Sequence, residues 1–94
     1  MNDQDFEWDE AKACLNILKH GLSFELAQEV FKDIYACEWP DEREDYGEAR
    51  FIIIGMVQTR LIAVTYTIRE TKFRLISARK AGPRERRYYH EQQD

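Results

Sequence analysis

The chain has 94 residues, of which 44% are hydrophobic and 13% aromatic, which suits one small folded domain and excludes both disorder and a separate ligand domain. It has no apolar signal core, no stretch near the roughly 18 apolar residues that span a bilayer, and too few cysteines for a disulfide framework, so we expect a soluble cytoplasmic protein. The net charge of −4 divides into −10 for residues 1–48, with 4 Lys/Arg and 14 Asp/Glu, and +6 for residues 49–94, with 10 and 4.

Two helices are predicted in the first third of the chain. The first covers roughly Glu10 to His20, where Asp9 can cap the start and Gly21 suits the end. Ser23 is predicted to cap the second helix. Because the connection is so short, the two helices are expected to pack as a hairpin. The apolar residues with helical spacing are Ala11, Leu15, Leu18 and Leu22 for the first helix, and Leu26, Ala27, Val30 and Phe31 for the second.

Extended segments and one short helix are predicted for the rest of the chain. Residues 33–40 are expected to contain an edge strand that Pro40 ends, followed by an acidic loop. Three β-rich runs cover residues 50–56, 60–68 and 72–79, and their short connections predict an antiparallel meander. Pro83 suits the first position of a terminal helix that runs through about Glu91. We therefore expect an α+β domain with an N-terminal helical hairpin, a three- to four-stranded antiparallel sheet and a short C-terminal helix.

Arginines are concentrated at the predicted strand ends and on the terminal helix. The guanidinium group forms a planar fork that suits bidentate contacts with phosphate, so these side chains could position an RNA backbone. The alternative is that the basic half of the chain pairs with the acidic half inside the fold. The arginines are Arg50, Arg60, Arg69, Arg74 and Arg79 near strands, and Arg84, Arg86 and Arg87 on the helix.

Histidine and tyrosine supply the other candidate groups. His20 could act as a general acid or base, or it could simply cap the first helix. Tyr66, Tyr88 and Tyr89 could stack on unpaired bases, although Tyr66 also suits a half-buried strand position. The carboxylates of residues 41–48 are interpreted as a solvated loop, and the cysteines and histidines lack metal-ligand spacing. The sequence predicts no metal and no nucleotide cofactor.

Short motifs cover most of the chain, from about residue 6 to residue 89. They are FEWDEAK (6–12), Asn16, KHGLSFELAQEVF (19–31), Asp33, Asp41, GEAR (47–50), VTYT (64–67), Arg69, RLISARKA (74–81), Glu85-Arg86 and Tyr88. Together they resemble the BrnT-type toxins of type II toxin–antitoxin systems. The resemblance implies a fold similar to the RelE-like ribonucleases and an RNA-cleaving activity that inhibits translation. It also implies a BrnA-type antitoxin, which neutralises the toxin and represses the shared operon through a ribbon-helix-helix DNA-binding part.

The resemblance also implies a set of site residues by matched position. The catalytic candidates are Lys19, His20, Arg50, Tyr66, Arg69 and Arg79, and Arg74, Arg84 and Arg87 are expected to bind RNA. A metal-independent route fits these residues: a ribose 2′-OH attacks the adjacent phosphate, arginines stabilise the developing charge, and His20 or Tyr66 could move protons. The alternative is a non-catalytic module that binds RNA or protein with the same basic surface.

Overall fold

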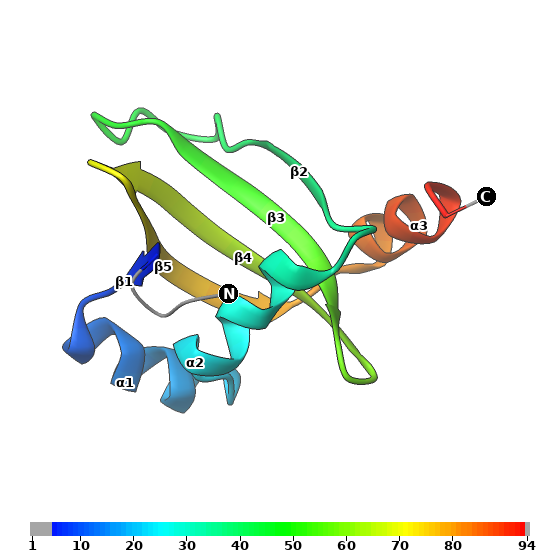
Figure 1. Cartoon of the computed structure of the whole chain (residues 1–94), viewed down its shortest axis with the longest axis horizontal. Coiled ribbons are helices and arrows are strands. Elements are labelled where there is room, and N and C mark those ends of the chain that lie inside the picture. The colour runs from blue at the N-terminus through cyan, green and yellow to red at the C-terminus, as the bar shows by residue number, and fades with distance from the viewer. Residues whose placement is uncertain (1–4, 94) are drawn as a thin grey trace.

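The computed structural model describes residues 5–93, which form a five-stranded sheet with helices on both of its faces (Figure 1). The order of strands across the sheet is β1-β5-β4-β3-β2. No helix in residues 5–93 is long and apolar enough to cross a membrane. The elements are β1 (Phe6–Glu7), α1 (Glu10–His20), α2 (Phe24–Ala27), the 3-10 helix η2 (Gln28–Lys32), β2 (Cys37–Pro40), β3 (Arg50–Val57), β4 (Arg60–Arg69), β5 (Lys72–Lys80) and α3 (Pro83–Glu91).

The predicted α+β class and the order of helix, sheet and helix are confirmed, but the predicted antiparallel sheet of three or four strands is wrong. The sheet has five strands and is mixed, because β1 pairs parallel to β5, with Phe6 opposite Phe73 and Glu7 opposite Arg74. The other neighbouring strands pair antiparallel, as predicted. A strand of two residues is too short to show the alternation by which strands are recognised in a sequence.

Helix α1 begins and ends as predicted, but of the four apolar residues that predict it only Leu22, just beyond the helix end, is buried in the core. The Asp9 side chain accepts a hydrogen bond from the Lys12 N–H at 3.1 Å, and Gly21 ends the helix with a left-handed φ of 69°. Leu15 and Leu18 are 61% and 83% exposed. The buried residues of the helix are instead Ala13 and Asn16.

Asn16 connects helix α1 to strand β5 through two hydrogen bonds and to the segment after α1 through a third. Its Nδ2 donates to the carbonyl oxygens of Leu22 and Ala78, both at 2.9 Å, and its Oδ1 accepts from the Ala78 N–H at 3.0 Å. Strand β1 pairs with β5 only at residues 73 and 74, so the backbone of Ala78 lies on an edge that β1 leaves uncovered. Asn16 supplies the missing partner there, which is why a polar residue occupies the buried side of the helix.

The second predicted helix is split into α2 and η2, and both lie with α1 on one face of the sheet (Figure 1). Ser23 caps α2 as predicted, and Ala27 and Val30 are fully buried. Helix η2 packs closely on β3 at Gly55, where an added Cβ would lie 2.9 Å from Val30 Cγ1. Helices α1, α2 and η2 therefore form a layer over the sheet, with α1 and α2 on β5 and η2 on β3.

The other face of the sheet packs against α3 at one end, and we call it the α3 face. Side chains alternate between faces along a strand, and cross-strand partners share a face. Ile54, Leu61 and Ala63 form a cluster here with Tyr89 of α3. Helix α3 begins at Pro83 as predicted, and the Glu85 side chain accepts from the Gly82 N–H at 2.8 Å.

Asp33 connects the end of η2 to both β3 and α3. Its carboxylate accepts hydrogen bonds from the Met56 N–H at 2.7 Å, from the Tyr35 N–H at 2.9 Å, and from the Tyr89 hydroxyl. Burial acts to raise the pKa of Asp33, but these three hydrogen bonds together outweigh it and hold the pKa below its ordinary value. The ionised form of Asp33 therefore stabilises the docking of α3.

Replacing Asp33 with asparagine is expected to lower the free energy of unfolding by about 2 kcal/mol at pH 7. Because the pKa of Asp33 is depressed in the folded state, this stabilisation is present above the unfolded pKa of about 3.9 and is lost as the pH falls through the folded value. Urea unfolding at pH 7 and below pH 4 measures the effect, with Asp45→Asn in the exposed loop as the control. The same difference from wild type at both pH values would contradict this role.

Candidate functional site

Strand register brings three of the predicted arginines to the α3 face. Arg50 and Arg74 stand on either side of Thr67, one on each strand beside β4, and Arg79 stands opposite Ala63. Neighbouring strands lie about 4.8 Å apart, so the backbones of Arg50 and Arg74 are roughly 10 Å apart. Arginines that are distant in the sequence therefore share one surface.

Two of these arginines are paired with carboxylates from the acidic half of the chain. Arg50 Nε lies 3.1 Å from a Glu48 oxygen, and Arg74 Nη1 lies 3.0 Å from a Glu7 oxygen. Arg69 is more exposed, and its Nη2 lies 3.9 Å from Glu48. For these arginines the two halves of the chain do neutralise each other, which was the alternative interpretation of the charge pattern.

Arg79 forms a bidentate ion pair with Glu85 where β5 leads into α3. Nη1 lies 2.7 Å from Oε1 and Nη2 lies 2.9 Å from Oε2, so both terminal nitrogens of the guanidinium group bond to the carboxylate. The hydrogen bonds from Arg79 lower the pKa of the Glu85 carboxyl despite its burial, and Glu85 is therefore ionised at neutral pH. The Arg79 side chain is 33% exposed, so solvent and ligands reach it.

A second arginine–carboxylate pair lies within electrostatic range of the first. Asp41 is buried and accepts from Arg43 Nε at 2.7 Å and from Arg43 Nη2 at 2.8 Å, which lowers its pKa. Glu85 raises the pKa of Arg79, and the positive charge of Arg43 opposes that rise. We call Asp41, Arg43, Arg79 and Glu85 the Arg79 cluster.

An apolar hollow adjoins the Arg79 cluster. It has a volume of about 450 Å³ and is lined by Trp39, Arg84, Glu85 and Tyr88. The rings of Trp39 and Tyr88 meet edge to face with their centroids 6.0 Å apart, and Tyr88 is 47% exposed. Exposed aromatic rings beside a cation are the surface on which unpaired bases stack. The geometry is therefore suited to the predicted stacking role of Tyr88, and it adds Trp39.

Tyr66 lies on the opposite face of the sheet, inside the core. It is 4% exposed and packs edge to face on Phe31, with ring centroids 5.1 Å apart. Its hydroxyl donates to Glu38 at 2.5 Å, and burial together with this bond raises the pKa of Tyr66 above its ordinary value. The structure therefore does not bring Tyr66 to the arginines of the α3 face.

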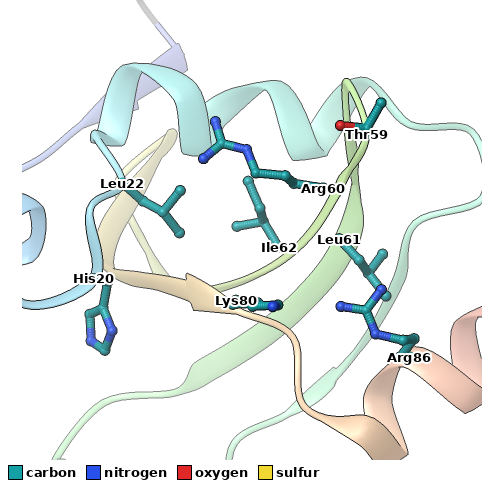
Figure 2. Close-up of a pocket in the computed structure, with 8 residues that line it drawn as sticks. All are labelled: His20, Leu22, Thr59, Arg60, Leu61, Ile62, Lys80 and Arg86. Atoms are coloured by element: carbon teal, nitrogen blue, oxygen red, sulfur yellow. The ribbon is translucent and has the colours of Figure 1, made fainter.

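Lys19 and His20 are also separated from the Arg79 cluster. Both are exposed at the end of α1, which packs on the face of the sheet opposite α3. His20 lines a different cavity, of about 380 Å³, together with Arg60, Lys80 and Arg86 (Figure 2). The remaining predicted RNA-binding residue, Arg87, is exposed on α3.

Sequence reasoning missed the contribution of Arg43, Trp39, Lys80 and Glu85. Arg43 is the single cation of residues 41–48. The carboxylates of this loop led to its interpretation as solvated surface, so Arg43 was not considered. Lys80 directly follows Arg79, and only its place in three dimensions sets it beside Arg86 and His20. Within residues 5–93, no three His, Cys, Asp or Glu side chains are grouped so that they could hold a metal ion.

These features define a small α+β protein that collects arginines, exposed aromatic rings and ionised carboxylates on one side of its sheet. Such a surface offers phosphate and base contacts together. The chain belongs to the BrnT family, which is described as a ribonuclease toxin of type II toxin-antitoxin systems and whose sequence model matches residues 8–85. A comparison with curated proteins gave no match.

Membership of this family confirms the resemblance seen in the sequence. It identifies the protein as a ribonuclease toxin of a type II toxin–antitoxin system, with RNA as its target and an antitoxin as its partner. The match ends at Glu85, so Arg86, Arg87 and Tyr88 lie outside the matched residues.

Proposed function

We propose that the protein cleaves RNA at the Arg79 cluster without a metal ion, and that this cleavage inhibits translation. The observation that carries the proposal is the planar fork of Arg79, one-third exposed and within electrostatic range of the guanidinium of Arg43, in a chain of a ribonuclease family. Fixed guanidinium groups stabilise the negative charge that develops on a phosphate during displacement. The RelE-like fold implied by the resemblance is part of this proposal.

The chemistry begins when a phosphate of the RNA replaces Glu85 on the fork of Arg79. The freed Glu85 carboxylate accepts the proton of the neighbouring 2′-OH, and the 2′ oxygen forms its bond to phosphorus. The bond from phosphorus to the 5′ oxygen breaks, and the leaving oxygen takes a proton from water. The products are a 2′,3′-cyclic phosphate and a 5′-hydroxyl end. Arg79 and Arg43 stabilise the transition state throughout.

The other predicted residues take supporting positions in this proposal. Arg50, Arg74 and Arg84 bind backbone phosphates along the α3 face, and Trp39 and Tyr88 stack on bases next to the cleaved bond. Arg69 and Arg87, both exposed, extend the cationic surface at its margins. Lys19 and His20 take no part in the proposed reaction, because α1 packs on the other face of the sheet.

The partner is proposed to be a BrnA-type antitoxin with a ribbon-helix-helix DNA-binding part. Support comes from the family, because a type II toxin is neutralised by a protein. In this arrangement the toxin reaches operator DNA only through its antitoxin, and both act in the cytoplasm. The alternative, a non-catalytic module that binds RNA or protein, would use the same α3 face but would leave RNA intact.

Cleavage of single-stranded RNA by the purified protein is expected to proceed at the same rate with and without EDTA. The reason is that every group in the proposed reaction belongs to the chain or to water. Gel analysis of a labelled RNA gives the rate, and mapping of the product ends should find the cyclic phosphate. Loss of cleavage in EDTA that Mg²⁺ restores would contradict the metal-independent route, and intact RNA under all conditions would favour the non-catalytic alternative.

A further inference from the structure

The cavity that contains His20 lies outside the Arg79 cluster. Its lining comes from the end of α1 and the segment after it, the turn before β4, the start of β4, the end of β5, and α3 (Figure 2). Leu22, Leu61 and Ile62 are buried and form its apolar wall. Its volume of about 380 Å³ leaves room for a small polar ligand.

Four basic side chains line this cavity. Arg60, Lys80 and Arg86 line it together with His20, and in Figure 2 the ammonium end of Lys80 is directed toward the guanidinium of Arg86. Within the part of the chain that the structure describes, none of these four side chains forms an ion pair with Asp or Glu, in contrast to Arg50, Arg74 and Arg79. Like charges repel one another, so this arrangement favours an anion among them.

The apolar wall strengthens this preference. Coulomb attraction between a cation and an anion grows as the surroundings become less polar, and one side of the cavity consists of buried aliphatic groups. Arg60 and Arg86 also carry planar forks, which suit the paired oxygens of a phosphate. The cavity therefore suits an anion with paired oxygens, such as a phosphate group.

The position of the cavity indicates where that phosphate comes from. Lys80 follows Arg79 on β5, and Arg86 follows Glu85 on α3, so the cavity and the Arg79 cluster lie on opposite sides of one junction. Neighbouring strand residues point to opposite faces. An RNA strand held at the Arg79 cluster that continues past this junction meets the cavity next.

We propose that this cavity binds a backbone phosphate of the RNA, away from the bond that is cleaved. The proposal rests on RNA being the ligand of the α3 face, and it gives His20 a phosphate-binding position in place of its predicted catalytic one. Phosphate binding in the cavity and RNA cleavage at the Arg79 cluster could fail separately, so the test uses a 2′-O-methyl RNA that cannot be cleaved.

The first measurement is the affinity for this RNA of the double variant Lys80→Ala/Arg86→Ala. Binding is expected to weaken at least 10-fold near 0.1 M salt, and the slope of log K against log salt is expected to fall by about one to two. Lys12→Ala/Lys32→Ala removes the same charge from helices on the face opposite α3, at positions that do not line the cavity, and serves as the matched control. Equal losses for the two double variants would show a general charge effect and overturn the proposal.

The second measurement follows the ring protons of His20 by NMR, with His90 of α3 as an internal reference outside the cavity. The 2′-O-methyl RNA is expected to shift His20 in the wild type and not in Lys80→Ala/Arg86→Ala. A shift caused by inorganic phosphate but not by RNA would mean that the cavity takes a free anion, and no shift with either would leave it without a ligand. Both results overturn the proposal. RNA that shifts His20 in a protein unable to cleave unmodified RNA would support the cavity and refute the proposed cleavage.

Discussion

Replacement of Arg79 with alanine is expected to slow single-turnover cleavage at saturating protein by about 10²- to 10³-fold. The change removes the fork that meets the phosphate and leaves Glu85 without its partner. Arg79→Lys keeps the charge but loses the bidentate geometry, so it should retain RNA binding and still cleave poorly. Comparison of the two variants therefore separates charge from shape.

The control for this prediction must show that the domain stays folded. Glu85 is only 17% exposed, so urea unfolding should accompany each rate measurement. Lys72→Ala, at the exposed start of β5, provides a cation deletion away from the cluster. Glu85→Gln should also slow cleavage, because the amide cannot accept the proton of the 2′-OH. Equal rates for Arg79→Ala and wild type would exclude Arg79 from the reaction.

The largest expected effect on stability comes from Asn16. Replacing it with alanine leaves three backbone groups without partners: the N–H and carbonyl of Ala78 and the carbonyl of Leu22. We expect the free energy of unfolding to fall by about 3 kcal/mol, because unsatisfied buried polar groups cost roughly 1 to 3 kcal/mol each and some regain water. Urea unfolding measures this loss.

The neighbouring residue Cys14 supplies the matched control. It lies on the same helix but is exposed, so Cys14→Ala should change stability by less than about 0.5 kcal/mol. The Asn16 variant should also loosen the contact between α1 and β5, which hydrogen exchange at Ala78 would report. A loss below about 1 kcal/mol for Asn16→Ala would mean that water replaces the side chain fully.

The parts of the fold that follow from local signals are the parts that sequence reasoning found. Asp9, Gly21 and Pro83 mark helix ends through their own backbone chemistry, and the strands from residue 50 to residue 80 are apolar, β-rich runs separated by short connections. Strand β1 could not be found in this way, because its pairing with β5 joins residues that lie far apart in the chain. The buried side of α1 was missed for a related reason: Asn16 is buried for its hydrogen bonds, and apolar spacing cannot reveal that.

The candidate site also has features that the sequence could predict and features that it could not. Arg79 could be named as a candidate because it lies at the end of a predicted strand and carries a group suited to phosphate. Its relation to Arg43 could not, because only the folded loop brings the two charges within range of each other. The cavity around His20 was beyond sequence reasoning as well, since its four basic groups come from α1, β4, β5 and α3.

The hydrogen bonds of Asn16 also affect how copies of this protein meet one another. An uncovered strand edge offers unpaired backbone groups to which a strand of another molecule can add, and such addition leads to aggregation. On β5, Asn16 occupies the groups at Ala78 that an added strand would need. On the opposite edge, β2 has only four residues and ends in Pro40, which has no N–H to donate. Both margins of the sheet are therefore poor templates for the addition of a strand from another molecule.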